Sequence, residues 1–291
     1  MSMKRPILYI TPAVLLILAA TSVALAVLGL EIIRKDIART TEKEVRADIE
    51  AAFGSIVIAK GERDKIVSAE FRQENESRSP YVDYRLRGDR GELKIETDHE
   101  DSRWWGRKKG ERKREWILKF TDAVPLDLNI EFGAGQGEID LTGLQIQNLS
   151  VSSGASSVEL TCDEPNPIVA EKVDIESGVS KFDARNLANL NFEKMSFSGG
   201  VGAYKLDFGG KLQQDAKIKV EVGLGAVTIY IPRETAARVE FEDHWFAEFD
   251  VDDGLKKVKK GIYETNNYQR AKARLTFELE AGLGSVKVRQ R

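Results

Sequence analysis

The sequence predicts an all-β protein, a right-handed β-coil of stacked rungs, each about 22 residues long, preceded by one transmembrane helix. Two observations predict this fold. A glycine-centred motif with alternating apolar residues on both sides recurs six times between Asn129 and Val288. Near the N-terminus, the run from Pro6 to Ile33 is almost entirely apolar, and Glu31 is its only ionised side chain.

The composition narrows the function classes before any motif is considered. Of 291 residues, 42% are hydrophobic, which is enough for a core and excludes wholesale disorder. The 44 basic and 47 acidic residues leave a net charge of -3, so we expect no nucleic-acid partner. Cys162 is the single cysteine, and His99 and His244 are the two histidines. So few Cys and His ligands predict no metal site, and we also expect no cofactor and no catalytic residues.

The apolar run is expected to bring the chain to a membrane. Residues 1–5 form a short tail, and residues 6–33 exceed the roughly 20 residues that a transmembrane helix needs. The small residues Ala24 and Ala26 would also suit a signal sequence cleaved after Ala26. Apolar residues continue past that position, which favours an uncleaved anchor in contact with membrane lipid.

The side of the membrane on which the main domain lies is less clear from the sequence. Lysines and arginines after the run outnumber those before it, which favours a cytoplasmic main domain. A five-residue tail before a long apolar run is instead typical of an export signal. We expect a single-pass protein whose main domain lies outside the cytoplasm.

Beyond a juxtamembrane linker at residues 34–44, the chain reads as strands. Val45, Ala47 and Ile49 alternate with charged residues, the period of a half-buried strand. Similar alternation recurs along the chain, and no helix of comparable clarity follows. We therefore assign residues 45–232 to the β-repeat, and residues 233–291 to a β-hairpin extension with the last rung of the same domain.

The repeat is the most informative feature of the sequence. Its leading glycines are structural positions where the chain turns sharply or backbones approach closely. These are Gly133, Gly154, Gly178, Gly200, Gly223 and Gly282. The first five are 21, 24, 22 and 23 residues apart, and the last interval of 59 leaves room for an inserted strand pair. One residue follows each leading glycine, and we expect it to point inward and stack: Ala134, Ala155, Val179, Val201, Leu224 and Leu283.

Several short motifs in this order resemble the toast-rack domain. They include Gly54-Ser55-Ile56, Pro80 to Tyr84, Trp116-Ile117-Leu118, the Gly-x-Gly rungs, Leu206 to Gly210 and Ile231-Pro232. Such domains occur in bacterial cell-wall-stress regulators of the LiaF kind and in related putative-adhesin proteins. The resemblance covers roughly residues 45–291 and implies a racked β-domain at the bacterial cytoplasmic membrane, in contact with an envelope or signalling protein. This chain has one apolar segment where LiaF proteins have several.

One local composition is a candidate binding segment. Between Arg103 and Trp116, basic residues are interleaved with tryptophans, a mixture that can bind anionic lipid or polymer. The candidate contact residues are Arg103, Trp104, Trp105, Arg107, Lys108, Lys109, Arg112, Lys113 and Arg114. The alternative is a solvated loop with Trp116 in the core of the next strand.

These observations favour a membrane-anchored, non-catalytic scaffold or sensor of envelope stress that acts through protein contacts. A surface adhesin or a module that binds glycan or anionic polymer is the alternative. A polysaccharide-acting β-helix enzyme is a third interpretation, which requires an acidic groove across the rungs that hold Asp140, Asp183 and Asp207.

Overall fold

The computed structural model describes residues 19–25, 30–74, 79–97, 114–241 and 247–291. Most of them lie in strands. The first strands are β1 Ala19–Leu25, β2 Leu30–Ala38, β3 Glu44–Lys60, β4 Lys65–Glu74, β5 Tyr81–Arg87, β6 Arg90–Glu96 and β7 Glu115–Phe120. The central strands are β8 Leu126–Asp140, β9 Ile146–Thr161, β10 Lys172–Arg185, β11 Lys194–Asp207 and β12 Ala216–Ile231. The last are β13 Ala236–Phe241, β14 Ala247–Val251, β15 Leu255–Lys259, β16 Ile262–Thr265 and β17 Arg274–Gln290. Two short 3-10 helices, η2 Leu187–Leu190 and η3 Tyr268–Arg270, lie in connections.

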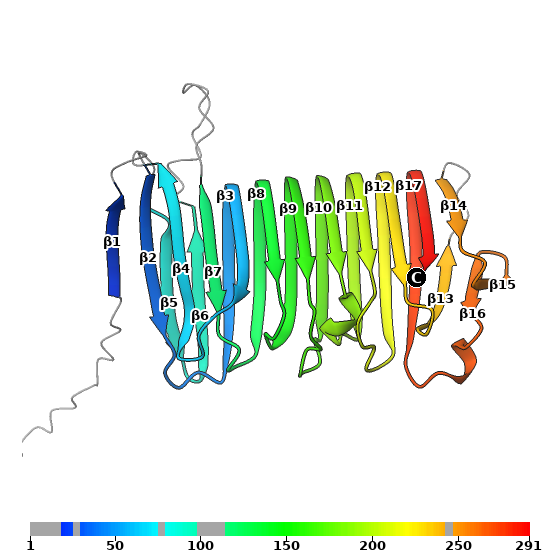
Figure 1. Ribbon diagram of the computed structural model, residues 1–291, viewed down its shortest axis with the longest axis horizontal. Coiled ribbons are helices and arrows are strands. Elements are labelled where there is room, and N and C mark those ends of the chain that lie inside the picture. Colours follow the sequence, from blue (N-terminus) through cyan, green and yellow to red (C-terminus); the bar gives the residue numbers. More distant parts are fainter. Residues whose placement is uncertain (1–18, 26–29, 75–78, 98–113, 242–246) are drawn as a thin grey trace, which may run out of the picture.

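Seven long strands form the body of the protein as a stack of parallel rungs. They follow one another in the order β3, β8, β9, β10, β11, β12 and β17. Figure 1 shows each long strand turning over at the same edge of the stack, so that its two halves form opposite faces. The all-β stack and its six predicted rungs, β8 to β12 and β17, are confirmed.

The inward-facing positions change parity where each strand turns over. In β10, Val173, Ile175 and Ser177 are buried before the turn, whereas Ser180, Phe182 and Ala184 are buried after it. Gly178 and Val179 between them lie on the outside of the turn, and Val179 is 64% exposed. The prediction that the residue after each leading glycine points inward is therefore wrong. The turn leaves no interior space at its tip, because the two halves of the rung already pack against each other there.

The leading glycines stack on one another as predicted. A Cβ on Gly154 would lie 2.3 Å from the carbonyl oxygen of Gly133, and one on Gly282 would lie 2.7 Å from that of Gly223. Both distances are shorter than any real Cβ contact, so only glycine allows adjacent rungs to approach this closely. The glycine two residues further along has positive φ in several rungs, for example 148° at Gly225.

Large and small side chains compensate each other inside the turns. The rung β11 combines Gly199 before its turn with Tyr204 after it, and the Tyr204 ring fills the space beside Gly199. The rung β8 reverses the order, with buried Phe132 before the turn and Gly137 after it. The core is thus filled rung by rung, as close packing of a narrow interior requires.

Shorter strands cover both ends of the stack. At one end, β6 and β7 pair in parallel with the two halves of β3, and β5 and β4 pair antiparallel with them. At the other end, β13 and β14 pair in parallel with the two halves of β17. The strands β15 and β16 form an antiparallel pair next to β13. The 59-residue interval thus holds four short strands, rather than the one inserted pair expected from the sequence.

The N-terminal segment differs from its prediction wherever the structure describes it. Residues 19–25 are strand β1 and residues 30–38 are strand β2, which pairs antiparallel with β4. Ile33 and Ile37 of β2 are buried against the stack. Their side chains lie on the same face of β2, as expected for a strand whose successive side chains point to opposite faces. In the described residues no helix has the length and apolar character needed to span a membrane. Residues 1–18 and 26–29 of the predicted anchor lie outside the described part of the chain.

Candidate interaction surfaces

The predicted basic-aromatic segment falls almost entirely outside the described residues. Of its candidates, residues 103–113 are not described, and the structure places Arg114 alone. The described chain stops at Thr97, whose Oγ1 accepts a hydrogen bond from the Ala52 amide, and resumes at Arg114. Because β6 and β7 pair with the two halves of β3, Thr97 and Arg114 both lie near the edge where the other rungs turn over.

The last residues of that segment are structural. The Arg114 guanidinium lies 4.6 Å from the centre of the Phe53 ring, and Arg114 is only 6% exposed. That burial contradicts its prediction as a lipid-contacting residue, because the side chain packs on an aromatic face. Trp116 is buried and meets Phe71 edge to face at 5.3 Å, which confirms the alternative that placed it in the core.

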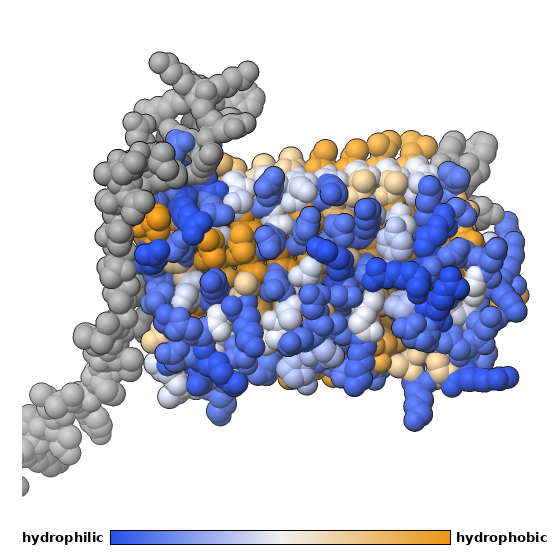
Figure 2. Space-filling model, in the orientation of Figure 1, coloured by the Kyte–Doolittle hydropathy of each residue, from blue (hydrophilic) through white to orange (hydrophobic). Residues whose placement is uncertain are grey.

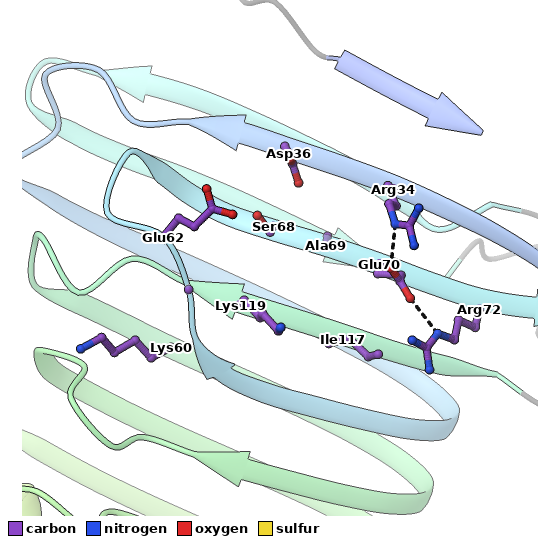
Figure 3. A pocket seen from close by; sticks show the side chains of 11 residues that line it. Arg34, Asp36, Lys60, Glu62, Ser68, Ala69, Glu70, Arg72, Ile117 and Lys119 are labelled. Carbon is purple, nitrogen blue, oxygen red and sulfur yellow. Dashed lines mark hydrogen bonds and ion pairs between the residues drawn. The ribbon is translucent and has the colours of Figure 1, made fainter. Parts of the chain in front are cut away.

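A polar groove lies on the outer face of β2, β4 and β7 near the N-terminal end of the stack. It encloses about 450 Å³ and is lined by both cations and carboxylates. Figure 3 shows Glu70 at its centre between two arginines. The Arg34 and Arg72 guanidinium groups each lie 2.7 Å from the Glu70 carboxylate. Burial opposes ionisation of Glu70, but these hydrogen bonds outweigh it and hold its pKa below the ordinary value.

The charges of this groove are largely used within the protein. Lys65 lies 3.0 Å from both Asp36 and Glu62, and Lys60 lies 3.1 Å from Asp122. Exposed pairs of this kind each contribute little to stability, about 0–1 kcal/mol. The groove is therefore better described as a surface ion-pair network than as a site that awaits a charged ligand.

The outward residues of the turns form a continuous row that we call the corner ridge. It consists of Ala134, Ala155, Val179, Val201, Leu224 and Leu283, which are paired in register from β8 to β17. Figure 2 shows hydrophobic side chains along the upper edge of the stack, over these rungs. Sequence reasoning found these residues but assigned them to the interior. The signal it missed is the pair of consecutive outward positions at each turn, which shifts the buried alternation by one residue.

The acidic residues proposed for an enzymatic groove do not converge. Asp140 accepts hydrogen bonds from the Thr142 amide and the Thr161 hydroxyl, within its own turn and the next rung. Asp207 is 4% exposed and forms an ion pair with Arg291. Asp183 lies in register with Lys205 of β11, on another row than Asp140. This placement does not support the acidic groove that a β-helix enzyme requires.

The other titratable candidates of the sequence are one cysteine and two histidines, of which the structure describes the cysteine. Cys162 is 1% exposed and donates to the carbonyl oxygen of Glu164 at 3.3 Å. Burial raises the pKa of the Cys162 thiol to about 12, so it is not a thiolate nucleophile near neutral pH. His99 and His244 lie outside the described residues. Within the described ranges, no cluster of three His, Cys, Asp or Glu side chains could hold a metal ion.

Two family models together match residues 31–288, which include almost the whole stack of long strands. The model of the N-terminal domain of toast_rack matches residues 31–185, which is more than half of the chain. The chain belongs to the toast-rack family. A second model, described as the C-terminal part of LiaF of the cell wall-active antibiotics response, matches residues 182–288. The two matches meet inside β10, so one continuous stack carries both toast-rack regions.

Solved structures with a similar arrangement come from several bacteria. A putative cell adhesion protein from Clostridium sporogenes is 17% identical, with 90% of this chain and 100% of that chain covered at a TM-score of 0.46. A putative adhesin from Bacteroides fragilis is 13% identical, with 89% and 97% covered at a TM-score of 0.37. A putative lipid binding protein from Parabacteroides distasonis is 10% identical, with 89% and 97% covered at a TM-score of 0.28. No curated protein matches the toast-rack chain.

Proposed function

We propose that this toast-rack protein is a membrane-anchored, non-catalytic scaffold or sensor in the bacterial response to cell-wall stress, acting through protein contacts. The observation that carries the proposal is the match of residues 182–288 to the LiaF C-terminal model, whose description names a response to cell wall-active antibiotics. The described surfaces agree with it, because the charges of the polar groove form ion pairs with one another and the three aspartates Asp140, Asp183 and Asp207 do not converge.

The anchor in this proposal is the apolar run that precedes β2. Residues 6–29 are enough to span a bilayer, since about 20 residues suffice. The structure gives residues 19–25 as β1, paired with β2, so the proposal requires β1 to leave that pairing when lipid is present. Figure 1 shows β1 as the outermost strand at its end of the stack, where its departure would leave the rungs intact.

The proposed side of the membrane is the outer one, where cell-wall damage is met. A phosphatase reporter that is active only outside the cytoplasm, fused after Arg291, should be active in living cells. Activity only from a cytoplasmic reporter at the same position would reverse this assignment.

The deciding experiment for the function is genetic. Deletion of the gene should change the transcriptional response to a cell wall-active antibiotic by several fold, and the full chain should restore it. A deletion strain with an unchanged response, but with impaired attachment to surfaces or glycans, would favour the adhesin alternative instead.

The basic-aromatic segment provides a second contact with the envelope in this proposal. Full chain held in nanodiscs of zwitterionic lipid should bind anionic vesicles, more weakly as salt rises, because each basic residue adds about 1 kcal/mol near anionic headgroups. Replacement of the six basic residues at positions 103–113 with Gln should abolish this binding, and Arg114 is retained because it packs on Phe53. The matched control replaces six exposed lysines elsewhere, namely Lys194, Lys211, Lys217, Lys256, Lys257 and Lys259. Equal loss in both variants would show only a net-charge effect.

A further inference from the structure

The corner ridge exposes apolar side chains in a way that the rest of the described surface does not. The large hydrophobic residues on it are 44–64% exposed, and they are adjacent on four consecutive rungs: Val179, Val201, Leu224 and Leu283. The other exposed large hydrophobic residues among those described are Tyr81, Val169 and Val258, which lie on separate elements. Single exposed apolar residues are ordinary, but a contiguous row of them marks an interaction site.

A hollow runs along one shoulder of this ridge. It measures about 430 Å³ and is bounded by the turns of β11, β12 and β17. Gly199, Gly223 and Gly282 line it, and so do the carboxylate residues Glu221 and Glu280. A partner that lies in this hollow would contact the ridge with one side and carboxylates with the other.

The carboxylates belong to a row that follows the ridge from rung to rung. This acidic row consists of Glu131, Glu176, Glu221 and Glu280, with Ser152 and Ser198 at the rungs between them. Glu131 and Glu176 are exposed, and neither lies within ion-pair distance of a lysine or arginine among the described residues. Lys219 lies 2.6 Å from Glu221 and 3.5 Å from Glu280, so one cation serves both. The row therefore retains negative charge for a basic partner.

The spacing of the ridge selects the partner's secondary structure. Neighbouring rungs lie about 4.8 Å apart, so the ridge presents one apolar side chain at each such step. An α-helix repeats an apolar stripe every turn of about 5.4 Å, and its i, i+3 and i+4 spacings bracket the rung distance. An extended strand repeats on one face only every 6.6–6.8 Å or so, which falls out of step within two rungs.

The geometry points to the corner ridge and acidic row as the docking site for a cationic amphipathic α-helix of a partner protein. The helix lies along the stack, with its apolar stripe on the ridge and its basic residues over the carboxylates. The inference rests on the proposed scaffold function, because it names the chemistry of the protein contact through which the scaffold acts. An anionic bilayer is a poorer occupant, since the acidic row would repel its headgroups.

The test uses the full chain in zwitterionic nanodiscs and a fluorescent 18-residue peptide with a leucine stripe flanked by lysines on one side. Anisotropy should report binding that weakens with salt, with empty nanodiscs as the blank. Changing Val179, Val201, Leu224 and Leu283 to Ser should weaken binding at least tenfold, and so should changing Glu131, Glu176, Glu221 and Glu280 to Gln. The acidic variant changes no apolar side chain, so it tests the site even where the ridge variant folds poorly.

Two matched controls should bind within twofold of the wild type. One carries Tyr81→Ser, Val169→Ser and Val258→Ser, and the other changes Glu138, Glu171, Glu193 and Glu248, which are exposed elsewhere, to Gln. A peptide of the same composition with two central prolines should not bind, because it cannot form the helix. Equal binding of that peptide, no binding of the helical one, or unchanged binding by the ridge and acidic variants would overturn the inference.

Two further outcomes would assign the corner ridge to another occupant and so overturn the inference that a partner helix docks there. In one, the ridge variant loses only association with anionic vesicles; in the other, it loses only self-association. Failure of the peptide while gene deletion still alters the antibiotic response would reject the docking site and leave the scaffold function standing. An unaltered response with intact peptide binding would reject the scaffold function instead.

Discussion

The Tyr84 hydroxyl donates a 2.6 Å hydrogen bond to Oε1 of Glu42, which lies in the turn before β3. The Thr40 amide donates to the other carboxylate oxygen, also at 2.6 Å. Glu42 is 3% exposed, and its burial opposes ionisation, but these hydrogen bonds outweigh it and hold its pKa below the ordinary value. A buried carboxylate thus fastens β5 to the start of the first long rung.

Replacement of Glu42 with Gln should lower stability at pH 7 by about 1.5–3 kcal/mol, because hydrogen bonds to a charged group are lost. Since the folded pKa is the lower one, the stabilisation is present above the unfolded pKa and is lost as pH falls through the folded value. Urea midpoints of wild type and variant should therefore converge in acid. A constant gap from pH 7 to pH 3 would contradict this, and Glu248→Gln at an exposed site serves as the control.

A methyl group added at Gly199 should destabilise the β11 rung. Its Cβ would lie 2.5 Å from Cε2 of Tyr204, and overpacking of this kind costs about 1–3 kcal/mol. The same Gly199→Ala change should cost little in a Tyr204→Val background, because Val occupies the equivalent position in β9 and β12. Equal costs in both backgrounds, measured by chemical denaturation, would show that the ring is not the cause.

The outward direction of the turn residues predicts a contrast between two valines of one rung. Val173 is fully buried, so Val173→Ala should lower the unfolding free energy by roughly 2 kcal/mol. Val179 is 64% exposed, so Val179→Ala should change it by less than about 0.5 kcal/mol. Comparable losses of unfolding free energy at both positions would show that the Val179 side chain points inward, as the sequence alone suggested.

The Cys162 thiol should be unreactive in the folded protein. Burial raises its pKa to about 12, so little thiolate exists at pH 8, and its sulfur is also shielded from solvent. The rate at which iodoacetamide modifies Cys162 should be at least a hundredfold higher in the denatured protein than in the folded protein. Rapid modification of the native chain at pH 8, followed by mass spectrometry, would place the thiol at the surface instead.

The stack was predictable because its signal repeats. Each of the six rungs has its leading glycine at the same position of the motif, and this sets the register in which neighbouring rungs pair. Gly154 approaches the backbone of Gly133 so closely that only glycine fits there. The direction of Val179 was not predictable from alternation, because two consecutive residues lie outside the turn and the parity changes there. The strands β13 and β14 carry no repeat, so their pairing with β17 depends on contacts that the repeat does not predict.

Candidate sites were less predictable than the fold. Arg114 looked like part of a basic run, yet the aromatic ring that buries it, Phe53, is 61 residues earlier in the chain. Ile33 closed the predicted helix and Ile37 fell in the predicted linker, whereas both lie in β2, which pairs with the neighbouring strand β4. In each case the deciding partner came from another strand, which local composition does not reveal.

The short strands at the two ends of the stack cover its terminal rungs. A row of parallel rungs left open would offer unpaired amides and carbonyls to another chain, and fibres grow by that kind of addition. Here β15 borders one end with Lys256, Lys257 and Lys259, all exposed, so an incoming strand would meet crowded positive charge. The protein can thus carry a long, regular ladder without offering a free template for growth into a fibre.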